Sequence, residues 1–147
     1  MKITIDENIN NEDEIVIRCS SINQKVLDLI TMIESLNHTI LVNKNDEIIK
    51  LDISSILYFE SVDKKTFVYT EQDVYEISLR LYEIEDKYNN LDFFRASRSF
   101  VVNLHKITSI KSMFGSRLEL LLENNEKIIV SRKYIKTLKE ILDERRE

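Results

Sequence analysis

Apolar and polar residues alternate in two short stretches at the start of the chain, residues 2–5 and residues 14–18. A period of two residues is typical of strands with one buried face. The polar run between the two stretches, residues 6–13, contains three Asn and suits a loop. The pattern therefore predicts two strands joined by a polar loop.

Helical spacing replaces the alternation after Ser20 and Ser21, which offer a cap for a helix N-terminus. This pattern predicts a helix of about four turns that stops at Asn37. Residues 1–37 are thus expected to form a β-β-α unit, which is too small to bury its own apolar face and must pack on the rest of the chain or on a second copy. The apolar residues of the helix are Ile22, Val26, Leu29, Ile30, Ile33 and Leu36.

Residues 38–147 show a different pattern, which predicts a second domain that is mainly β with short helices (α+β). Its strands are expected to form a β-sandwich or several small antiparallel sheets. Asn124 and Asn125 suit a tight primed turn between the last two strands, and Ser131 suits the cap of the last helix. The expected strands are 39–42, 47–51, 56–60, 67–69, 74–77, 107–112, 117–122 and 127–130, and the expected helices are 79–88 and 132–142.

The composition limits the class of protein. The 147 residues are 43% apolar with one Gly and no Pro, so we expect a folded core whose turns are made by Asn, Asp and Ser. Cys19 is the only cysteine, which excludes an internal disulfide, and we expect it to be a small buried residue. The chain shows neither a signal-peptide pattern nor an apolar run near the roughly 20 residues of a membrane span, so we expect a cytoplasmic protein.

Charge is distributed unevenly along the chain. The net charge of −5 by itself disfavours a nucleic-acid partner. Residues 1–36, however, carry three basic and seven acidic side chains, whereas residues 93–139 carry ten basic and three acidic ones. A basic C-terminal third is a footprint of polyanion binding, although a solvated charged face is the commoner cause of any single basic stretch.

The residue pattern does not support a catalytic or metal site. His38 and His105 are the only histidines, and neither has the spacing of a metal ligand pair. One Gly excludes a Gly-rich phosphate loop, and Ser97, Arg98 and Ser99 lack a nearby general base. We therefore expect no enzyme, no catalytic residue, no cofactor, no metal and no small-molecule substrate.

Basic and hydroxyl side chains gather in the segment FFRASRSFVVN, residues 93–103. Its aromatic residues and valines suit a core, while Arg95, Ser97, Arg98 and Ser99 supply groups that bind a phosphate backbone and a base edge. For this segment alone, an ion pair of Arg95 or Arg98 with a carboxylate across a sheet is the alternative.

Two further clusters of the same kind favour the anion-binding interpretation. Ser131, Arg132 and Lys133 open the last predicted helix, where unpaired backbone N–H groups and the positive helix end attract anions. Lys64, Lys65 and Thr66 lie on a predicted loop between two strands.

Three segments in this order resemble the LytTR DNA-binding domain of bacterial transcription regulators: ILYFES at 56–61, FFRASRSFVVN at 93–103 and IVSRKY at 129–134. The resemblance spans roughly residues 39–142. It implies a fold of several small sheets and short helices whose loops enter successive major grooves on one face of DNA, without a recognition helix. It also implies a transcription regulator that recognises imperfect direct repeats in promoter DNA.

The resemblance assigns roles to individual residues of this sequence. The base-reading positions of the family fall on Thr66, Arg98 and Lys133. Asn103, at the end of an apolar run, is expected to be structural, because an amide can satisfy the backbone groups of a turn. Neighbours expected to complete the DNA-binding set are Lys64, Lys65, Arg95, Ser97, Ser99, Arg132 and Lys136.

The N-terminal unit departs from the best-known layout of the family, which has a phosphoacceptor receiver domain, so we do not expect phosphorelay control. An acidic β-β-α unit also occurs in a subgroup of single-domain regulators, for which the resemblance implies a membrane-protein regulator as a candidate partner. The broad apolar stripe of residues 22–36 makes the unit a candidate surface for homodimerisation or regulation. Packing of the unit on its own DNA-binding domain is the alternative.

A second class of function accounts for part of the pattern. A β-rich interaction module would bind an acidic protein or single-stranded RNA through the same basic face, and aromatic residues that stack on bases would favour RNA. Phe93, Phe94 and Phe100, however, alternate with polar residues as core anchors do. This alternation favours double-stranded promoter DNA as the partner.

Overall fold

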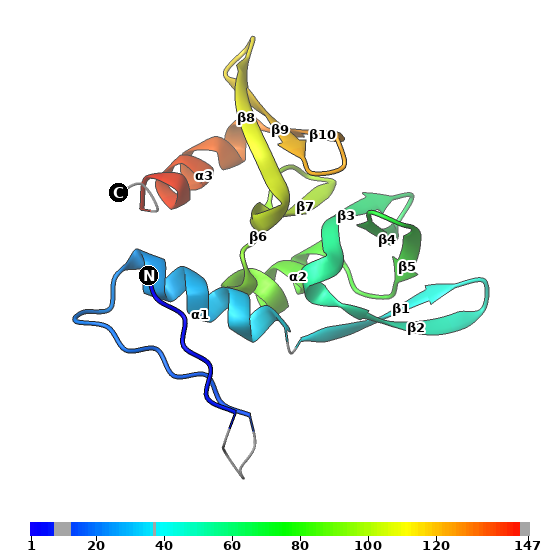
Figure 1. Ribbon diagram of the computed structural model, residues 1–147. Coiled ribbons are helices and arrows are strands. Elements are labelled where there is room, and N and C mark those ends of the chain that lie inside the picture. Colours follow the sequence, from blue (N-terminus) through cyan, green and yellow to red (C-terminus); the bar gives the residue numbers. More distant parts are fainter. Residues whose placement is uncertain (8–12, 37, 145–147) are drawn as a thin grey trace.

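Two antiparallel sheets carry the fold of the computed structural model, which describes residues 1–7, 13–36 and 38–144 (Figure 1). The strands are β1 (Thr39–Lys44), β2 (Glu47–Asp52), β3 (Ile56–Val62), β4 (Lys65–Thr70), β5 (Val74–Ile77), β6 (Phe93–Arg95), β7 (Phe100–Asn103), β8 (Ile107–Met113), β9 (Arg117–Leu122) and β10 (Lys127–Val130). The helices are α1 (Gln24–Leu36), α2 (Leu81–Tyr88) and α3 (Arg132–Glu144), and the short 3₁₀ turns are η1 (Ile53–Ser55), η2 (Asn89–Leu91) and η3 (Leu104–Lys106). The expected fold class, mainly β with short helices and several antiparallel sheets, is confirmed.

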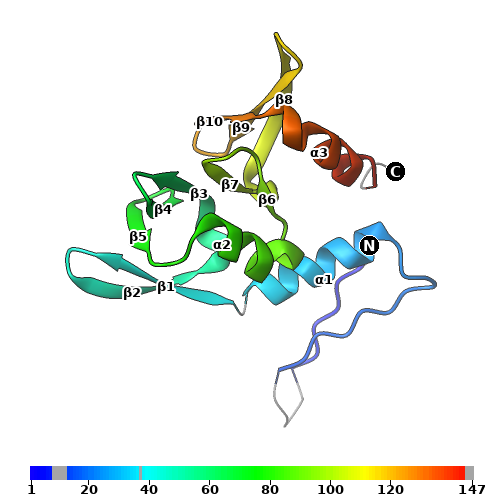
Figure 2. The same cartoon turned by 180° about the vertical axis from the view of Figure 1, so that it is seen from behind.

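The order of the strands shows that most of them join one large sheet. This sheet has seven strands in the order β2-β1-β5-β4-β3-β7-β6, and the smaller sheet has three in the order β10-β9-β8. The β1–β2 hairpin and helix α1 point to opposite sides of the molecule, while the β8–β9 hairpin projects at the top in both views (Figures 1 and 2).

Strand β3 separates two hydrophobic cores. Phe59 packs in the first core, which α2 closes by contacts with β3, β6 and β7. Tyr58 packs in the second core, together with the three-stranded sheet and Leu138 of α3. Because both faces of β3 are covered, residues 56–59 are all buried and the alternation of apolar and polar residues disappears there.

Tight turns join the strands with very little help from glycine. The backbone angle φ is positive at both Asn45 and Asp46, between β1 and β2, and at both Asp63 and Lys64, between β3 and β4. Two successive positive angles are the pattern of a type I′ hairpin turn, in which Asn and Asp are tolerated best after Gly.

The turn between β9 and β10 differs from the tight primed turn predicted at Asn124 and Asn125. Of these two residues only Asn125 has a positive φ, of 69°. Its N–H donates a hydrogen bond to the carbonyl of Leu122 at 2.9 Å, and the N–H of Leu122 donates to the carbonyl of Glu126 at 2.9 Å. The prediction of a two-residue turn is therefore wrong, whereas both predicted arms of the hairpin are confirmed.

The prediction of two strands near the N-terminus is also wrong. Residues 2–5 and 14–18 form no strand, and the apolar side chains of Ile3, Ile5 and Ile15 are exposed. An alternating segment becomes a strand only where a partner supplies backbone hydrogen bonds, and a lone pair of strands is marginal in water. Part of the loop predicted between them, residues 8–12, lies outside the described residues.

Helix α1 starts later than the sequence predicts. Asn23, rather than Ser20 or Ser21, is the cap, because its Oδ1 accepts a hydrogen bond from the N–H of Val26 at 3.0 Å. Cys19, just before this cap, is exposed, so the expectation of a buried cysteine is wrong.

The helix of the N-terminal unit lies on the second domain. Helix α1 contacts η1 and η2, and Val26 is buried. Ile22 and Ile30 are nevertheless exposed, so part of the apolar stripe is not covered. The contacts support packing of the helix on the rest of the chain, and the division of the chain at residues 37 and 38 stays a prediction.

Asn103 has the structural role that its position in the sequence suggests. The residue is buried, its Nδ2 donates a hydrogen bond to the carbonyl of Ile56 at 2.9 Å, and its Oδ1 accepts one from the N–H of His105 at 3.0 Å. One side chain thus joins the end of β7 to the start of β3 and caps η3.

Replacing Asn103 should therefore weaken the fold. We expect Asn103→Ala to lower the free energy of unfolding by roughly 1–3 kcal/mol, because the Ile56 carbonyl loses a buried donor. Chemical denaturation measures the change. Asn90→Ala, at an exposed position, is the control and should change the free energy of unfolding by less than about 0.5 kcal/mol. Equal stability of the two variants would contradict the structural role of Asn103.

Candidate nucleic-acid interface

Two backbone hydrogen bonds bring the three basic clusters of the sequence together. The loop between β6 and β7, residues 96–99, lies at the centre. Its Ser99 carbonyl accepts a hydrogen bond from the N–H of Ser61, near the β3–β4 turn, at 2.9 Å. Its Ala96 carbonyl accepts one from the N–H of Ser131, just before α3, also at 2.9 Å. The clusters at residues 64–66, 95–99 and 131–136 therefore belong to one surface.

The side chain of Arg95 stabilises the central loop by hydrogen bonds to two of its backbone carbonyls. Its Nε donates to the carbonyl of Ser97 at 2.7 Å and its Nη2 donates to the carbonyl of Arg98 at 2.8 Å. Its Nη1 forms an ion pair with Glu85 of α2 at 2.8 Å. The carboxylate comes from a helix rather than from across a sheet. All three guanidinium nitrogens are thus engaged within the protein. We infer that Arg95 positions the loop, and the DNA contact that the sequence suggests for it stays a prediction.

Arg98 lies at the tip of this loop and is exposed. In the described part of the chain its guanidinium forms no hydrogen bond or ion pair. The two serines on either side of Arg98, by contrast, bind each other. Ser97 Oγ accepts a hydrogen bond from the N–H of Ser99 at 3.2 Å, and this bond stabilises the turn. The loop therefore presents one unpaired guanidinium fork, supported by residues that hold its backbone.

The first cluster has two available cations and one buried hydroxyl. Lys64 lies in the β3–β4 turn, where its carbonyl accepts a hydrogen bond from Arg80 Nη1 at 3.1 Å, and Lys65 begins β4 with an exposed side chain. Thr66 was expected on the loop as a base-reading residue, but it lies in β4 opposite Ser61 and is only 3% exposed. A side chain with this burial does not reach a base edge, so the loop placement of Thr66 is wrong and we omit it from the interface.

The start of α3 supplies the third cluster. Arg132, Lys133 and Lys136 are exposed. The Nε of Arg132 donates to the carbonyl of Gly115 at 2.8 Å, and the Nζ of Lys133 lies 5.4 Å from the ring centre of Tyr134. The backbone carbonyl of Ser131, rather than its hydroxyl, accepts the hydrogen bond from the N–H of Tyr134 at 3.0 Å.

A groove of about 690 Å³ runs between the central loop and the start of α3. Four of its lining residues are basic, and no carboxylate side chain is among the described residues that line it. Arg117 and Lys127, at the starts of β9 and β10, were not assigned to the site from the sequence. The signal for them was present, because each precedes a buried residue in an alternating strand and therefore faces outward. The lining residues are Ser97, Phe100, Arg117, Lys127, Ile128, Ile129, Ser131, Arg132 and Lys133.

Phe100, which lines this groove, belongs to a cluster of packed aromatic side chains. Phe100 meets Tyr58 edge to face at 5.7 Å between ring centres, and Tyr58 stacks on Tyr69 at 4.3 Å. Tyr58 also donates a hydrogen bond to Glu126 of the smaller sheet, and burial together with this bond raises the pKa of Tyr58 far above its usual range. The cluster therefore joins the two sheets directly beneath the basic surface.

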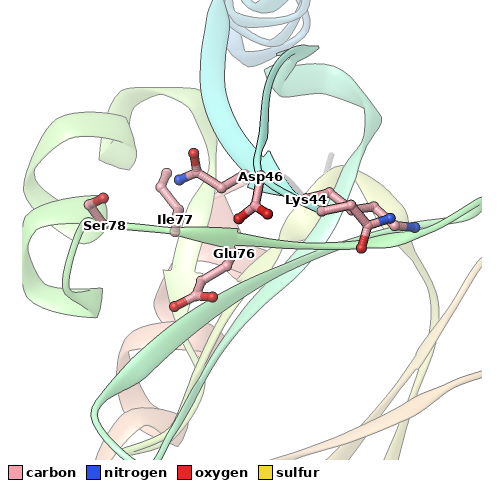
Figure 3. A pocket seen from close by; sticks show the side chains of 7 residues that line it. Lys44, Asp46, Glu76, Ile77 and Ser78 are labelled. Atoms are coloured by element: carbon pink, nitrogen blue, oxygen red, sulfur yellow. The ribbon is translucent and has the colours of Figure 1, made fainter.

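The hollow beside the β1–β2 turn has a different character (Figure 3). Lys44, Asp46 and Glu76 give it side chains of both charges. Lys44 forms an ion pair with Asp73, and this contact holds the pKa of the Asp73 carboxyl below its usual range. Two carboxylates line this hollow, and carboxylates repel a polyanion. No carboxylate is among the described lining residues of the basic groove, where Lys127 has an ion-pair partner, Glu119 at 3.8 Å, so the basic groove is the better candidate site.

The described residues contain no group of three or more His, Cys, Asp or Glu side chains arranged to hold a metal ion. In the same part of the chain, every helix is too short or too polar to cross a bilayer.

The fold and the row of cations on its loops define a β-rich nucleic-acid-binding domain. Residues 46–143 match the LytTr DNA-binding domain family. A solved LytTr DNA-binding domain, from a putative methyl-accepting/DNA response regulator of Bacillus cereus, superimposes with a TM-score of 0.68 and 30% identity, over 71% of this chain and 95% of that one. The chain belongs to the LytTR family of DNA-binding domains, and the resemblance noted in the sequence is confirmed.

Curated relatives are longer than this chain. The sensory transduction protein LytT of Bacillus subtilis (strain 168) is 36% identical over 105 residues, which are 71% of this chain and 44% of LytT. The transcriptional regulatory protein YpdB of Escherichia coli (strain K12) is 36% identical over 107 residues, which are 72% of this chain and 44% of YpdB. The matched region thus spans less than half the length of these relatives.

A lysine at position 95 tests the positioning role of Arg95. Arg95→Lys keeps the charge but loses the fork that holds the carbonyls of Ser97 and Arg98, so we expect DNA affinity to fall about tenfold, the loss of roughly 1–2 kcal/mol of hydrogen bonding. The dependence of affinity on salt should not change, because no phosphate contact is removed. Arg95→Gln removes the charge as well, and its salt slope, measured by fluorescence anisotropy on folded protein, should also stay unchanged. A slope lower by about one unit in Arg95→Gln would instead place Arg95 on a phosphate.

The raised pKa of Tyr69 predicts that the free energy of unfolding falls at alkaline pH. Burial and the hydrogen bond that Tyr69 donates to Glu60 at 2.7 Å raise the pKa of Tyr69 to about 12, above the ordinary value near 10. The neutral phenol is favoured in the folded state, so its contribution is complete below pH of about 10 and is lost as pH rises toward about 12.

Chemical denaturation across this pH range checks the effect. We expect Tyr69→Phe to lose less stability between pH of about 10 and 12 than the unchanged protein does. The variant Tyr82→Phe, at a tyrosine that is 64% exposed, is the control and should behave like the unchanged protein. An alkaline loss in Tyr69→Phe equal to that of the control would contradict the assigned pKa shift.

Proposed function

We propose that this protein is a sequence-specific transcription regulator that recognises imperfect direct repeats in promoter DNA through its loops and catalyses no reaction. The observation that carries the proposal is the unpaired Arg98 fork, held at the centre of a row of cations by Arg95 and by two backbone hydrogen bonds. A DNA partner supports the cytoplasmic location that the sequence predicts. The names of the relatives LytT and YpdB, sensory transduction and transcriptional regulatory proteins, support the regulatory role.

The contacts divide into two physical types. Arg98, at the tip of the β6–β7 loop, and Lys133, in the first turn of α3, are exposed and are the proposed base-reading residues. A guanidinium or ammonium can bind the O6 and N7 acceptors of guanine in the major groove. The surrounding residues are proposed to contact phosphates and fix the register. These are Lys64, Lys65, Ser97, Ser99, Arg132 and Lys136, joined by Arg117 and Lys127 of the groove.

Direct repeats require two DNA-binding domains on one duplex. We propose that residues 1–36 join two copies, because Ile3, Ile5, Ile15 and Val16 are exposed apolar side chains close to one another in the sequence. A tether between copies raises the effective concentration of the second domain without any new DNA contact. The same surface is the proposed contact for a regulator, which in the subgroup that this chain resembles would be a membrane protein.

Two substitutions separate base reading from phosphate contact. Arg98→Ala should cost roughly 1–3 kcal/mol on the specific site and flatten discrimination at one base pair. Lys65→Ala should weaken specific and random duplexes alike and lower the salt slope by about one unit.

Gel-shift titrations with promoter DNA, a scrambled duplex and a homopolymer RNA measure both effects. Equal weakening of the two duplexes by Arg98→Ala would show that Arg98 does not read a base. Preferential binding of the RNA by the unchanged protein would favour the RNA-binding function instead.

Self-association tests the proposed role of the N-terminal unit. We expect the full chain to form dimers in sedimentation experiments without DNA, and we expect Ile15→Asp to weaken them by placing a charge on the apolar surface. Thr4→Asp, which adds the same charge at a polar position, is the control. A full chain that remains monomeric at high concentration would exclude self-association and leave only a regulatory partner for this surface.

A further inference from the structure

The tip of the β8–β9 hairpin carries an aromatic side chain that the fold does not use. Phe114 is 103% exposed, the highest exposure among the large apolar residues described. Full burial of such a side chain is worth about 1.5–3 kcal/mol, so an unburied Phe at the end of a projecting hairpin has no role in stability (Figures 1 and 2). A surface that buries the ring on binding is the physical alternative.

The conformation of the tip is fixed rather than arbitrary. Gly115 and Ser116 have φ angles of 80° and 58°, in the left-handed region. The Gly115 carbonyl accepts the hydrogen bond from Arg132 Nε at 2.8 Å, and a Cβ added at Gly115 would lie 3.4 Å from Arg132 Nη2. The turn that presents Phe114 is therefore tied to the first residue of α3.

This connection makes the tip continuous with the basic row. Arg132 lines the groove that contains Lys133 and Ser97, and it also lines a second hollow, where Ser116 and Lys136 lie together with the carboxylates Glu140 and Asp143. The hairpin thus adjoins the basic start of α3.

The charge around the ring identifies the class of partner. Residues 106–118 contain Lys106, Lys111 and Arg117 and no acidic residue. Lys111, Met113 and Arg117 share the face of the hairpin that is turned away from the core, and all three are exposed. Glu119 also lies on this face, opposite Lys111 and farther from the tip than Arg117, and it pairs with Lys127 at 3.8 Å. An apolar ring flanked by cations suits a polyanion that also offers apolar surface, and the sugars and bases of DNA have both properties.

We propose that the β8–β9 hairpin is an additional DNA contact, in which Phe114 packs against the sugars and base edges of a groove beside the segment bound by Arg98 and Lys133, while Lys111 and Arg117 contact the phosphates there. This inference rests on the proposed function. A two-stranded ribbon fits a DNA groove, and apolar side chains placed against base steps are a known means of gripping and bending a duplex. The hairpin would lengthen the contacted segment beyond that reached by the three loops.

The test compares duplexes of two lengths. Fluorescence anisotropy measures the affinity of the full chain for a specific site with about one helical turn of flanking DNA on each side, and for the same site without flanks. We expect Phe114→Ala to weaken binding about fivefold or more on the long duplex and less than twofold on the short one. Its salt slope should not change, whereas Lys111→Ala, at a hairpin residue outside the groove, should lower the slope on the long duplex by about one unit and leave the slope on the short duplex unchanged.

The controls separate this inference from the proposed function. Tyr82→Ala removes another exposed aromatic residue, which is 64% exposed on α2, and should bind both duplexes like the unchanged protein. If the unchanged protein does not distinguish the specific site from random DNA, the proposed function fails. If it does distinguish them and Phe114→Ala binds both duplexes normally, or weakens on both equally, the hairpin contact is overturned. A change in self-association by Phe114→Ala with unchanged DNA affinity would assign the tip to a protein contact and would also overturn the proposal.

Discussion

The guanidinium of Arg95 is the constraint on which the DNA-binding surface depends. Its three nitrogens reach three different groups, the carbonyls of Ser97 and Arg98 and the carboxylate of Glu85. The β6–β7 connection is too short to form a helix or a strand of its own, so these hydrogen bonds determine the direction in which Arg98 leaves the loop. The loop then offers two further carbonyls, through which the neighbouring segments are held in place.

The two cores explain how segments far apart in the sequence meet at this loop. Strand β3 is common to both cores, and Tyr58 extends from it to Glu126 in the smaller sheet. The smaller sheet and α3 are therefore fixed against the β6–β7 end of the larger sheet. This packing brings Ser131 within hydrogen-bonding distance of Ala96, and the basic start of α3 follows directly.

Sequence patterns predicted most of the elements because strands and helices here obey local rules. The arms 117–122 and 127–130 alternate cleanly, since one face packs on the second core and the other faces outward. The same rule failed at residues 2–5 and 14–18, because alternation cannot show whether a partner strand is present. Helix α1 began at Gln24 rather than after Ser21, since three neighbouring polar residues can each serve as a cap and the sequence does not rank them.

The candidate site was predictable in its segments but not in the direction of each side chain. Thr66 and Arg95 lie in the expected segments. The side chain of Thr66, however, is buried in β4, and the side chain of Arg95 pairs with Glu85 of α2. Both orientations depend on contacts with distant parts of the chain. Arg117 and Lys127 belong to the smaller sheet, and they line the groove because this sheet packs against the central loop. Residue type and order therefore predicted which segments bind, whereas tertiary contacts decide which atoms are available.

The central claim is that one surface, formed by the β3–β4 turn, the β6–β7 loop and the start of α3, contacts DNA as a unit. Backbone amide chemical-shift mapping by NMR, during titration of the full chain with a specific duplex, tests it most directly. We expect the largest changes to cluster in residues 63–65, 96–99 and 131–136 and to develop together, with small changes in the β1–β2 hairpin. Changes concentrated in the β1–β2 hairpin or in α1, with the β6–β7 loop unaffected, would contradict the claim.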